Sequence, residues 1–183
     1  MRRSLRYGFV AAGCALLGAS SLTAGEGGRG PAKFSVRAAL EGFQEVPALS
    51  TVAKGRFKAD IDTEAKTITW KLDYSGLEGE VTQSHVHFGQ TSVNGGISFF
   101  LCSNLGNGPA GTQPCPQGSA ELSGVITPDL VVGPGAAPPA APGQGIEPGA
   151  LDEIAQAILK GVAYANVHST KWPGGEIRGQ LTY

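Results

Sequence analysis

The segment 67–74 alternates strictly between polar and apolar residues, and this period of two is the strongest constraint on the fold. An extended chain places the apolar members on one face, whereas a helix would scatter them around its circumference. We therefore predict a half-buried strand. The chain also has 28 glycines and 12 prolines among its 183 residues, a composition that favours short strands joined by many turns. The apolar members of the strand are Ile68, Trp70, Leu72 and Tyr74.

Further strands are expected on both sides of this one, and one segment changes period. Between 148 and 161 the apolar residues form a helical stripe, with Asp152 and Glu153 in the first turn and Gly161 placed as a C-terminal cap. We predict an all-β fold, a Greek-key antiparallel barrel or sandwich, with one short helix near 150–160. The other predicted strands are 34–40, 53–61, 81–88, 96–102, 120–127, 162–169 and 176–182.

The N-terminal residues have the composition of a targeting segment. Three arginines within the first six residues precede an uncharged run over 7–25, which is the anatomy of a secretory signal peptide. We expect the signal peptide to cover 1–24, a disordered lead-in 25–32, and a single domain 33–183. The expected location is secreted or periplasmic. A lipid anchor at Cys14 is the alternative, since 11–14 loosely resembles a lipoprotein box.

Charge and hydropathy after residue 24 exclude two classes of partner. The remaining chain has 11 basic and 15 acidic residues, so it has no electrostatic reason to bind nucleic acid or an anionic membrane. No apolar run in it approaches the ~20 residues that span a bilayer. We therefore expect a soluble protein whose macromolecular partner, if any, is an extracellular protein.

Two cysteines remain in that part of the chain, Cys102 and Cys115. An even pair in an exported protein predicts a disulfide. Closing a loop of roughly 14 residues contributes about 3 kcal/mol in the chain-entropy model. The alternative, a soft metal site, lacks a histidine nearby in the sequence.

The three histidines of the chain are His85, His87 and His168. Positions 85 and 87 share one face of a strand, opposite the apolar Val86, and Tyr164, Asn166 and His168 share one face of another. Three neutral imidazoles suit zinc or copper. The alternative is structural, with each histidine donating a hydrogen bond to a backbone carbonyl across the turn at Pro173.

Three charged residues are candidates for supporting such a site. Glu45 is interpreted as a further oxygen ligand or an orienting carboxylate, and otherwise as a solvated loop acid. Arg178 can guide anions towards a metal, and otherwise forms an ion pair with Glu176 on the same strand face. No nucleophile or phosphate-binding motif is present in the sequence, so we assign no catalytic residue.

Several stretches together resemble the CHRD domain, the module first recognised in chordin. The resemblance implies an extracellular module, since chordin is an extracellular antagonist of growth factors, but it does not define a molecular activity. The segments that carry it are 40–47 (LEGFQEVP), 77–89 (LEGEVTQSHVHFG) with Asn94-Gly95, 161–168 (GVAYANVH) and 173–181 (PGGEIRGQL).

A more remote similarity concerns the histidines. Segment 85–89 is similar to the copper-binding His-Val-His segment of copper/zinc superoxide dismutases, which are Greek-key barrels, and 166–168 is similar to a later segment of theirs. This implies at most three copper ligands, His85, His87 and His168, because the sequence has no further histidine for a zinc bridge. We predict an extracytoplasmic binding module with a copper or zinc site. The alternatives are a metal-dependent, superoxide-handling redox enzyme and a metal-free protein-interaction module.

Overall fold

The computed structural model describes residues 30–133 and 143–183, and these residues form an all-β fold with one α-helix. The predicted fold class is therefore confirmed, and the helix α1 spans Leu151–Leu159. Two 3₁₀ turns, η1 (Gly42–Gln44) and η2 (Pro128–Leu130), follow β1 and β6. The strands are β1 (Lys33–Glu41), β2 (Lys54–Asp62), β3 (Thr67–Ser75), β4 (Val81–Phe88), β5 (Gly96–Ser103), β6 (Ala120–Ile126), β7 (Ala163–Ser169) and β8 (Ile177–Gln180).

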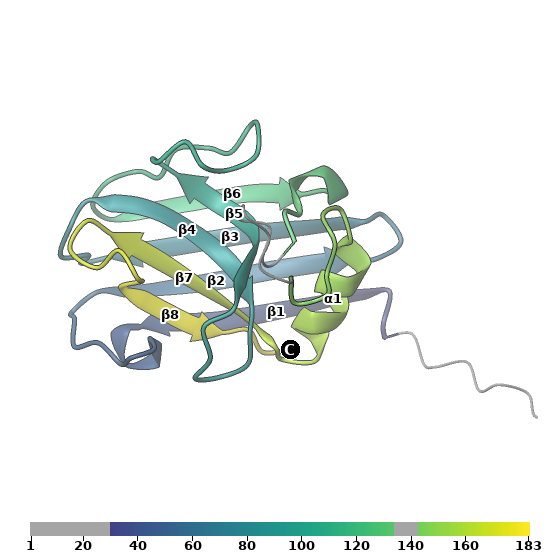
Figure 1. Ribbon diagram of the computed structural model, residues 1–183, viewed down its shortest axis with the longest axis horizontal. Coiled ribbons are helices and arrows are strands. Elements are labelled where there is room, and N and C mark those ends of the chain that lie inside the picture. Colours follow the sequence, from purple (N-terminus) through teal and green to yellow (C-terminus); the bar gives the residue numbers. More distant parts are fainter. Residues whose placement is uncertain (1–29, 134–142) are drawn as a thin grey trace, which may run out of the picture.

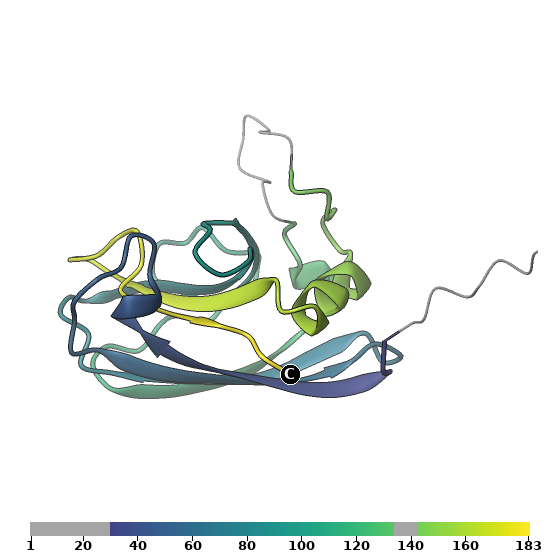
Figure 2. The same cartoon turned by 90° about the horizontal axis from the view of Figure 1, so that it is seen from below.

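The eight strands form one antiparallel sheet in the order β5-β4-β7-β8-β1-β2-β3-β6. The sheet folds over into two layers, with β1, β2, β3 and β6 in one and β4, β5, β7 and β8 in the other (Figures 1 and 2). The layers are joined where β1 pairs with β8. After β4, β5 and β6, the chain returns to place β7 beside β4, which is the long connection of a Greek key. The result is a nearly closed barrel with a seam between β5 and β6.

The core lies between the two layers and follows the alternation of the sequence. The four apolar residues of β3 are all buried, as predicted. In the other layer, Val86 of β4 and Ala165 and Val167 of β7 join the same apolar cluster. The intervening residues of β4 and β7 therefore project from the opposite face of that layer.

The helix lies at one end of the strands (Figure 1). It buries an apolar stripe that includes Leu151, Ile154 and Ile158, as its period of 3.6 predicts. Gly161 has a positive φ of 70° and its N–H donates to Ile158 O, so this residue ends the helix as a left-handed cap.

A disulfide-bonded loop bridges the seam between β5 and β6. Cys102 on β5 is bonded to Cys115, so the predicted pairing is present. Between the two cysteines, the Gln113 side-chain amide donates to Leu101 O on β5 and to Ser123 O on β6, at 3.3 and 3.2 Å. The loop therefore connects the two end strands of the sheet, which do not pair with each other along their length.

The predicted signal peptide and Cys14 lie outside the described residues, as does most of the predicted lead-in. β1 begins at Lys33, where the single domain is expected to start. Across 30–133 and 143–183, no helix has the length and apolar character that a membrane crossing requires.

Candidate metal centre

His85 and His87 project from β4 on the face opposite the core residue Val86. β4 lies between β5 and β7 in the sheet, and both imidazoles are buried on its outward face. Their residues are 1% and 8% exposed. The sequence predicts the more polar face of this strand for both histidines, and the structure places them there, although that face is not open to solvent.

His168 comes from the adjacent strand β7. In the pairing of β4 with β7, His85 lies opposite Asn166 and His87 lies opposite Tyr164. His168 is two residues beyond Asn166, so it is the diagonal neighbour of His85 on the same face. It is 6% exposed. Sheet register therefore brings together three histidines that are up to 83 positions apart in the chain.

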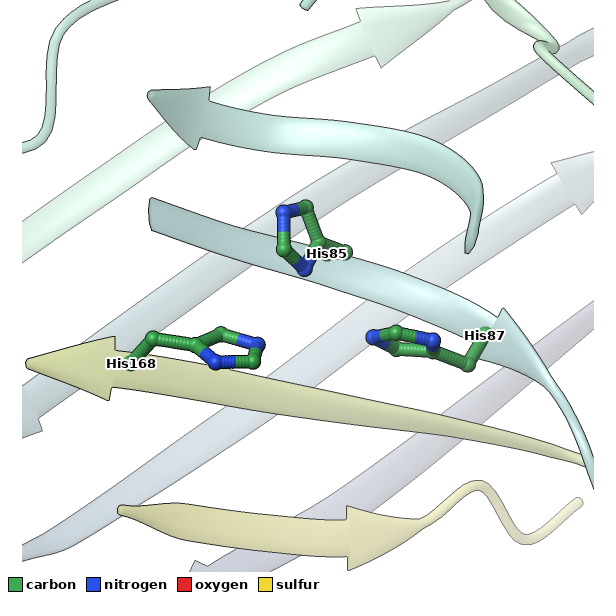
Figure 3. A group of neighbouring side chains, drawn as sticks. All are labelled: His85, His87 and His168. Carbon is green, nitrogen blue, oxygen red and sulfur yellow. The ribbon is translucent and has the colours of Figure 1, made fainter. Parts of the chain in front are cut away.

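The three rings point towards a common space (Figure 3). One potential ligand atom from each histidine lies within 4.8 Å of those of the other two. The centroid of the His85 ring is 5.3 Å from the centroid of the His87 ring and 4.9 Å from that of the His168 ring. Metal–nitrogen bonds of about 2.0–2.1 Å place ligand nitrogens roughly 3.3 Å apart in a tetrahedron. Small inward movements of the rings would therefore complete an ion site, and the donor set fits zinc or copper.

Backbone carbonyls orient two of the three rings. His87 Nδ1 donates to Gly95 O and His168 Nδ1 donates to Pro173 O, both at 2.9 Å. A carbonyl oxygen only accepts, so each Nδ1 carries the proton and each Nε2 has its lone pair available for an ion. Such hydrogen bonds are the usual support of a metal-binding histidine. The bond from His168 to Pro173 is also the contact that the structural alternative predicts.

His85 is held differently. Neither of its ring nitrogens has a hydrogen-bond partner among the described residues, and the same is true of His168 Nε2. The ring is in edge contact with Phe100 on β5, with centroids 4.7 Å apart. A buried polar atom without a partner costs about 1–3 kcal/mol. Three such nitrogens in one small space are therefore expensive unless something binds them.

The same burial keeps the rings neutral. Removal from water lowers the pKa of His85 to about 2 and that of His87 to about 4, and it also lowers the pKa of His168. The neighbouring imidazoles add to the effect on His85. At neutral pH all three are in the unprotonated form that a metal requires.

Tyr164 links the histidines to Arg178. The Tyr164 ring is stacked on His87, with centroids 4.7 Å apart and planes within 3°. The Arg178 guanidinium lies 3.4 Å from the centroid of the same ring, a cation–π contact. Because β7 lies between β4 and β8, the tyrosine separates the cation from the imidazole.

The prediction of an ion pair between Glu176 and Arg178 is wrong. The two side chains have different partners, because β8 begins at Ile177 and Glu176 belongs to the turn before it. The Glu176 carboxylate accepts from Thr51 Oγ1, Ser169 Oγ and Glu78 N. The Arg178 guanidinium donates to Asn94 Oδ1 and to the carbonyls of Gln90 and Val93. Arg178 is 1% exposed, so it is a packed residue and does not face solvent as an anion guide would.

Glu45 is buried at 7% exposure, so its interpretation as a solvated loop acid is also wrong. Burial raises its pKa to about 7, against the opposing effect of Arg178. Its carboxylate packs against Gly175, where an added Cβ would lie 2.5 Å from Oε1. The group of converging ligand atoms consists of the three histidines and does not include it. Glu45 therefore supports the turn that contains Pro173, the carbonyl partner of His168.

Sequence reasoning assigned no role to Tyr164 or Asn166, although both were placed on the face of His168. The signal that points to them is their spacing, since they precede His168 by four and two residues on one strand. The carbonyls of Gly95 and Pro173 have no such signal, because backbone atoms carry no sequence identity.

The fold and the histidine cluster define a class of protein, a small antiparallel β-barrel domain with a buried three-imidazole centre. Comparison with protein families gives the particular family. Residues 36–181 match the CHRD domain, and the chain belongs to this family. The matched region includes all three histidines and both bonded cysteines. No curated protein and no solved structure matches the chain.

Proposed function

We propose that this protein is an extracytoplasmic binding module that holds one copper or zinc ion with His85, His87 and His168. The observation that carries the proposal is the set of buried nitrogens that lack partners, two on His85 and Nε2 on His168. An ion that takes one nitrogen from each ring provides most of these atoms with a partner. When bound, it supplies a cross-link between β4 and β7 and a localised positive charge.

Each histidine has a defined part in this proposal. His87 and His168 are oriented by the carbonyls of Gly95 and Pro173, which leaves their Nε2 atoms available. His85 contributes a ring that no hydrogen bond orients; it packs against Phe100 and against the other two imidazoles. Two preset ligands and one adjustable ligand suit a site that must contract slightly on binding.

Burial supports binding over turnover. All three histidines are at most 8% exposed, and a redox enzyme must let its substrate reach the metal. The Arg178 side chain, which would guide an anionic substrate, instead donates to the 90–94 segment. These contacts favour the binding module over the superoxide-handling alternative.

A metal-free interaction module is the other candidate, and the two carbonyl contacts favour it equally. In that case the histidines stabilise the fold by hydrogen bonding. His85 separates the two hypotheses. A histidine that stabilises the fold by hydrogen bonding needs a hydrogen-bond partner, and neither ring nitrogen of His85 has one in the described chain.

An oxidising location is part of the proposal. The Cys102–Cys115 disulfide is typical of exported proteins, and the first 24 residues have the composition of a signal peptide. We propose a secreted or periplasmic protein, with an extracellular protein as its possible macromolecular partner.

The test is metal content by elemental analysis of the protein after reconstitution with copper and zinc and removal of loosely held ions. We expect about one equivalent in the wild type and none in a His85→Ala/His87→Ala double variant. Val86→Ala is the matched control, because it weakens the same strand from the core side without removing a ligand. Equal metal content in the wild type and the double variant, or none in the wild type, contradicts the proposal.

A further inference from the structure

A fourth polar side chain faces the three histidines. Asn166 lies opposite His85 in the pairing of β4 with β7, and it precedes His168 by two residues on the same strand face. It is 3% exposed. Its side-chain oxygen Oδ1 lies 3.1 Å from His87 Nε2.

This contact brings two hydrogen-bond acceptors together. His87 Nδ1 donates to Gly95 O, so in the neutral ring Nε2 has a lone pair and no proton. An amide oxygen also has only lone pairs to offer. Two lone-pair atoms at this distance repel each other unless a cation or a proton lies between them. The ring is buried beside two other imidazoles, which opposes a proton and its positive charge.

We propose that Asn166 Oδ1 is the fourth ligand of the ion held by His85, His87 and His168. This inference rests on the proposed metal-binding function and extends it to a closed site of three nitrogens and one oxygen. In a tetrahedral site with bonds of about 2.0–2.1 Å, neighbouring ligand atoms are roughly 3.3 Å apart. The 3.1 Å separation of Asn166 Oδ1 from His87 Nε2 is close to this value.

The donor set also determines which ions the site prefers. An amide oxygen is a hard ligand and imidazole is intermediate, so the set suits Zn²⁺ and Cu²⁺ better than Cu⁺, which prefers sulfur. All four ligands are neutral, so the positive charge of a divalent ion is left uncompensated in a buried site. A carboxylate at position 166 would compensate it in part. With four protein ligands in place, the ion has no vacant position for a substrate.

The experiment compares Asn166→Leu and Asn166→Asp with the wild type. Zinc affinity is measured by competition with a chromophoric chelator, and Co²⁺ absorption reports the ligand set. We expect Asn166→Leu to bind zinc at least 10-fold more weakly, because loss of even an outer-shell partner of a ligand costs about 10- to 100-fold in affinity. We expect Asn166→Asp to bind at least as tightly as the wild type, with a shifted Co²⁺ spectrum. Gln83→Leu is the control, because it removes a neighbouring amide that pairs with Asn107, and we expect no change in zinc affinity.

The sign of the effect tests the assignment. If the Asn166 amide instead donates its N–H to His87 Nε2, it competes with the ion, and Asn166→Leu will bind zinc as tightly as the wild type or more tightly. That result overturns the inference, as does an Asn166→Asp protein with the wild-type Co²⁺ spectrum and affinity. In either case, loss of metal from His85→Ala would still support the three-histidine site. A wild-type protein that binds no metal would refute both proposals.

Discussion

Replacing His85 by leucine should stabilise the protein when no metal is present. The ring is 1% exposed and both of its nitrogens are buried without hydrogen-bond partners in the described chain. Folding therefore removes two polar atoms from water without compensation. Leucine keeps an apolar contact with Phe100, which already lies against the ring, and it brings no polar atom into the site.

The size of the gain follows from that burial. Each nitrogen without a partner costs about 1–3 kcal/mol, and the difference in shape between the two side chains costs up to about 1.5 kcal/mol. For the two nitrogens of His85, this gives an expected net increase of about 0.5–6 kcal/mol in the free energy of unfolding of the metal-free protein. An ion at 100 times its dissociation constant would stabilise the wild type by about 2.7 kcal/mol and leave the variant unchanged.

Urea unfolding at pH 7.5, with a chelator and then with excess zinc, measures both quantities. At this pH the imidazole is neutral in the folded and the unfolded state, so titration does not contribute. His168→Leu is the control, since it leaves Pro173 O without its donor and should not stabilise. A metal-free His85→Leu protein that is less stable than the wild type by 1 kcal/mol or more would refute the reasoning.

Three further predictions concern the metal-free protein. Its stability should rise with pH between about 4 and 6.5, because burial lowers the pKa of His87 to about 4 while the unfolded ring titrates near 6.5. Each buried imidazole contributes up to about 1.4 kcal/mol per pH unit to this rise. Urea unfolding at pH 5 and at pH 7.5 will measure it. Glu45→Gln should make that rise steeper. Burial raises the pKa of Glu45 to about 7, so ionisation of the wild-type carboxyl lowers the free energy of unfolding as the pH rises from about 4.5 to 7, and the variant lacks this opposing effect. A shallower rise in the same titration would contradict this. Replacing Cys102 and Cys115, which are 13 positions apart, by serine should lower the free energy of unfolding by about 3 kcal/mol, as thermal unfolding beside the wild type will show.

The strands, and the strand faces on which the histidines lie, were predictable because they depend on local periodicity. The bounds of β4 are those predicted for 81–88, since apolar alternation and flanking turns are encoded within the segment itself. The same alternation assigned Val86 to the core and the histidines to the opposite face. Register then required only that β4 and β7 be neighbours, which the Greek-key topology provides.

The surroundings of the site were not predictable, because they depend on contacts between distant segments. The rings are buried by groups that include Phe100 and the carbonyls of Gly95 and Pro173, and no spacing pattern relates these to the histidines. Glu176 shows a second limit. Its pairing with Arg178 was inferred from a shared strand face, but the strand starts one residue later, and the carboxylate turns to other partners.

The loop that bridges the seam also affects how separate copies of the chain behave. An unpaired strand edge exposes backbone donors and acceptors on which another molecule can add a strand. Here β5 and β6 are such edges, and Gln113 occupies carbonyls on both while the bond to Cys102 holds its loop in place. Under reducing conditions the loop would keep its hydrogen bonds and the core packing of Cys115 but would lose this covalent attachment. We therefore expect the disulfide to protect the barrel against intermolecular strand addition, and we expect the chain to be most prone to aggregate before its cysteines are oxidised.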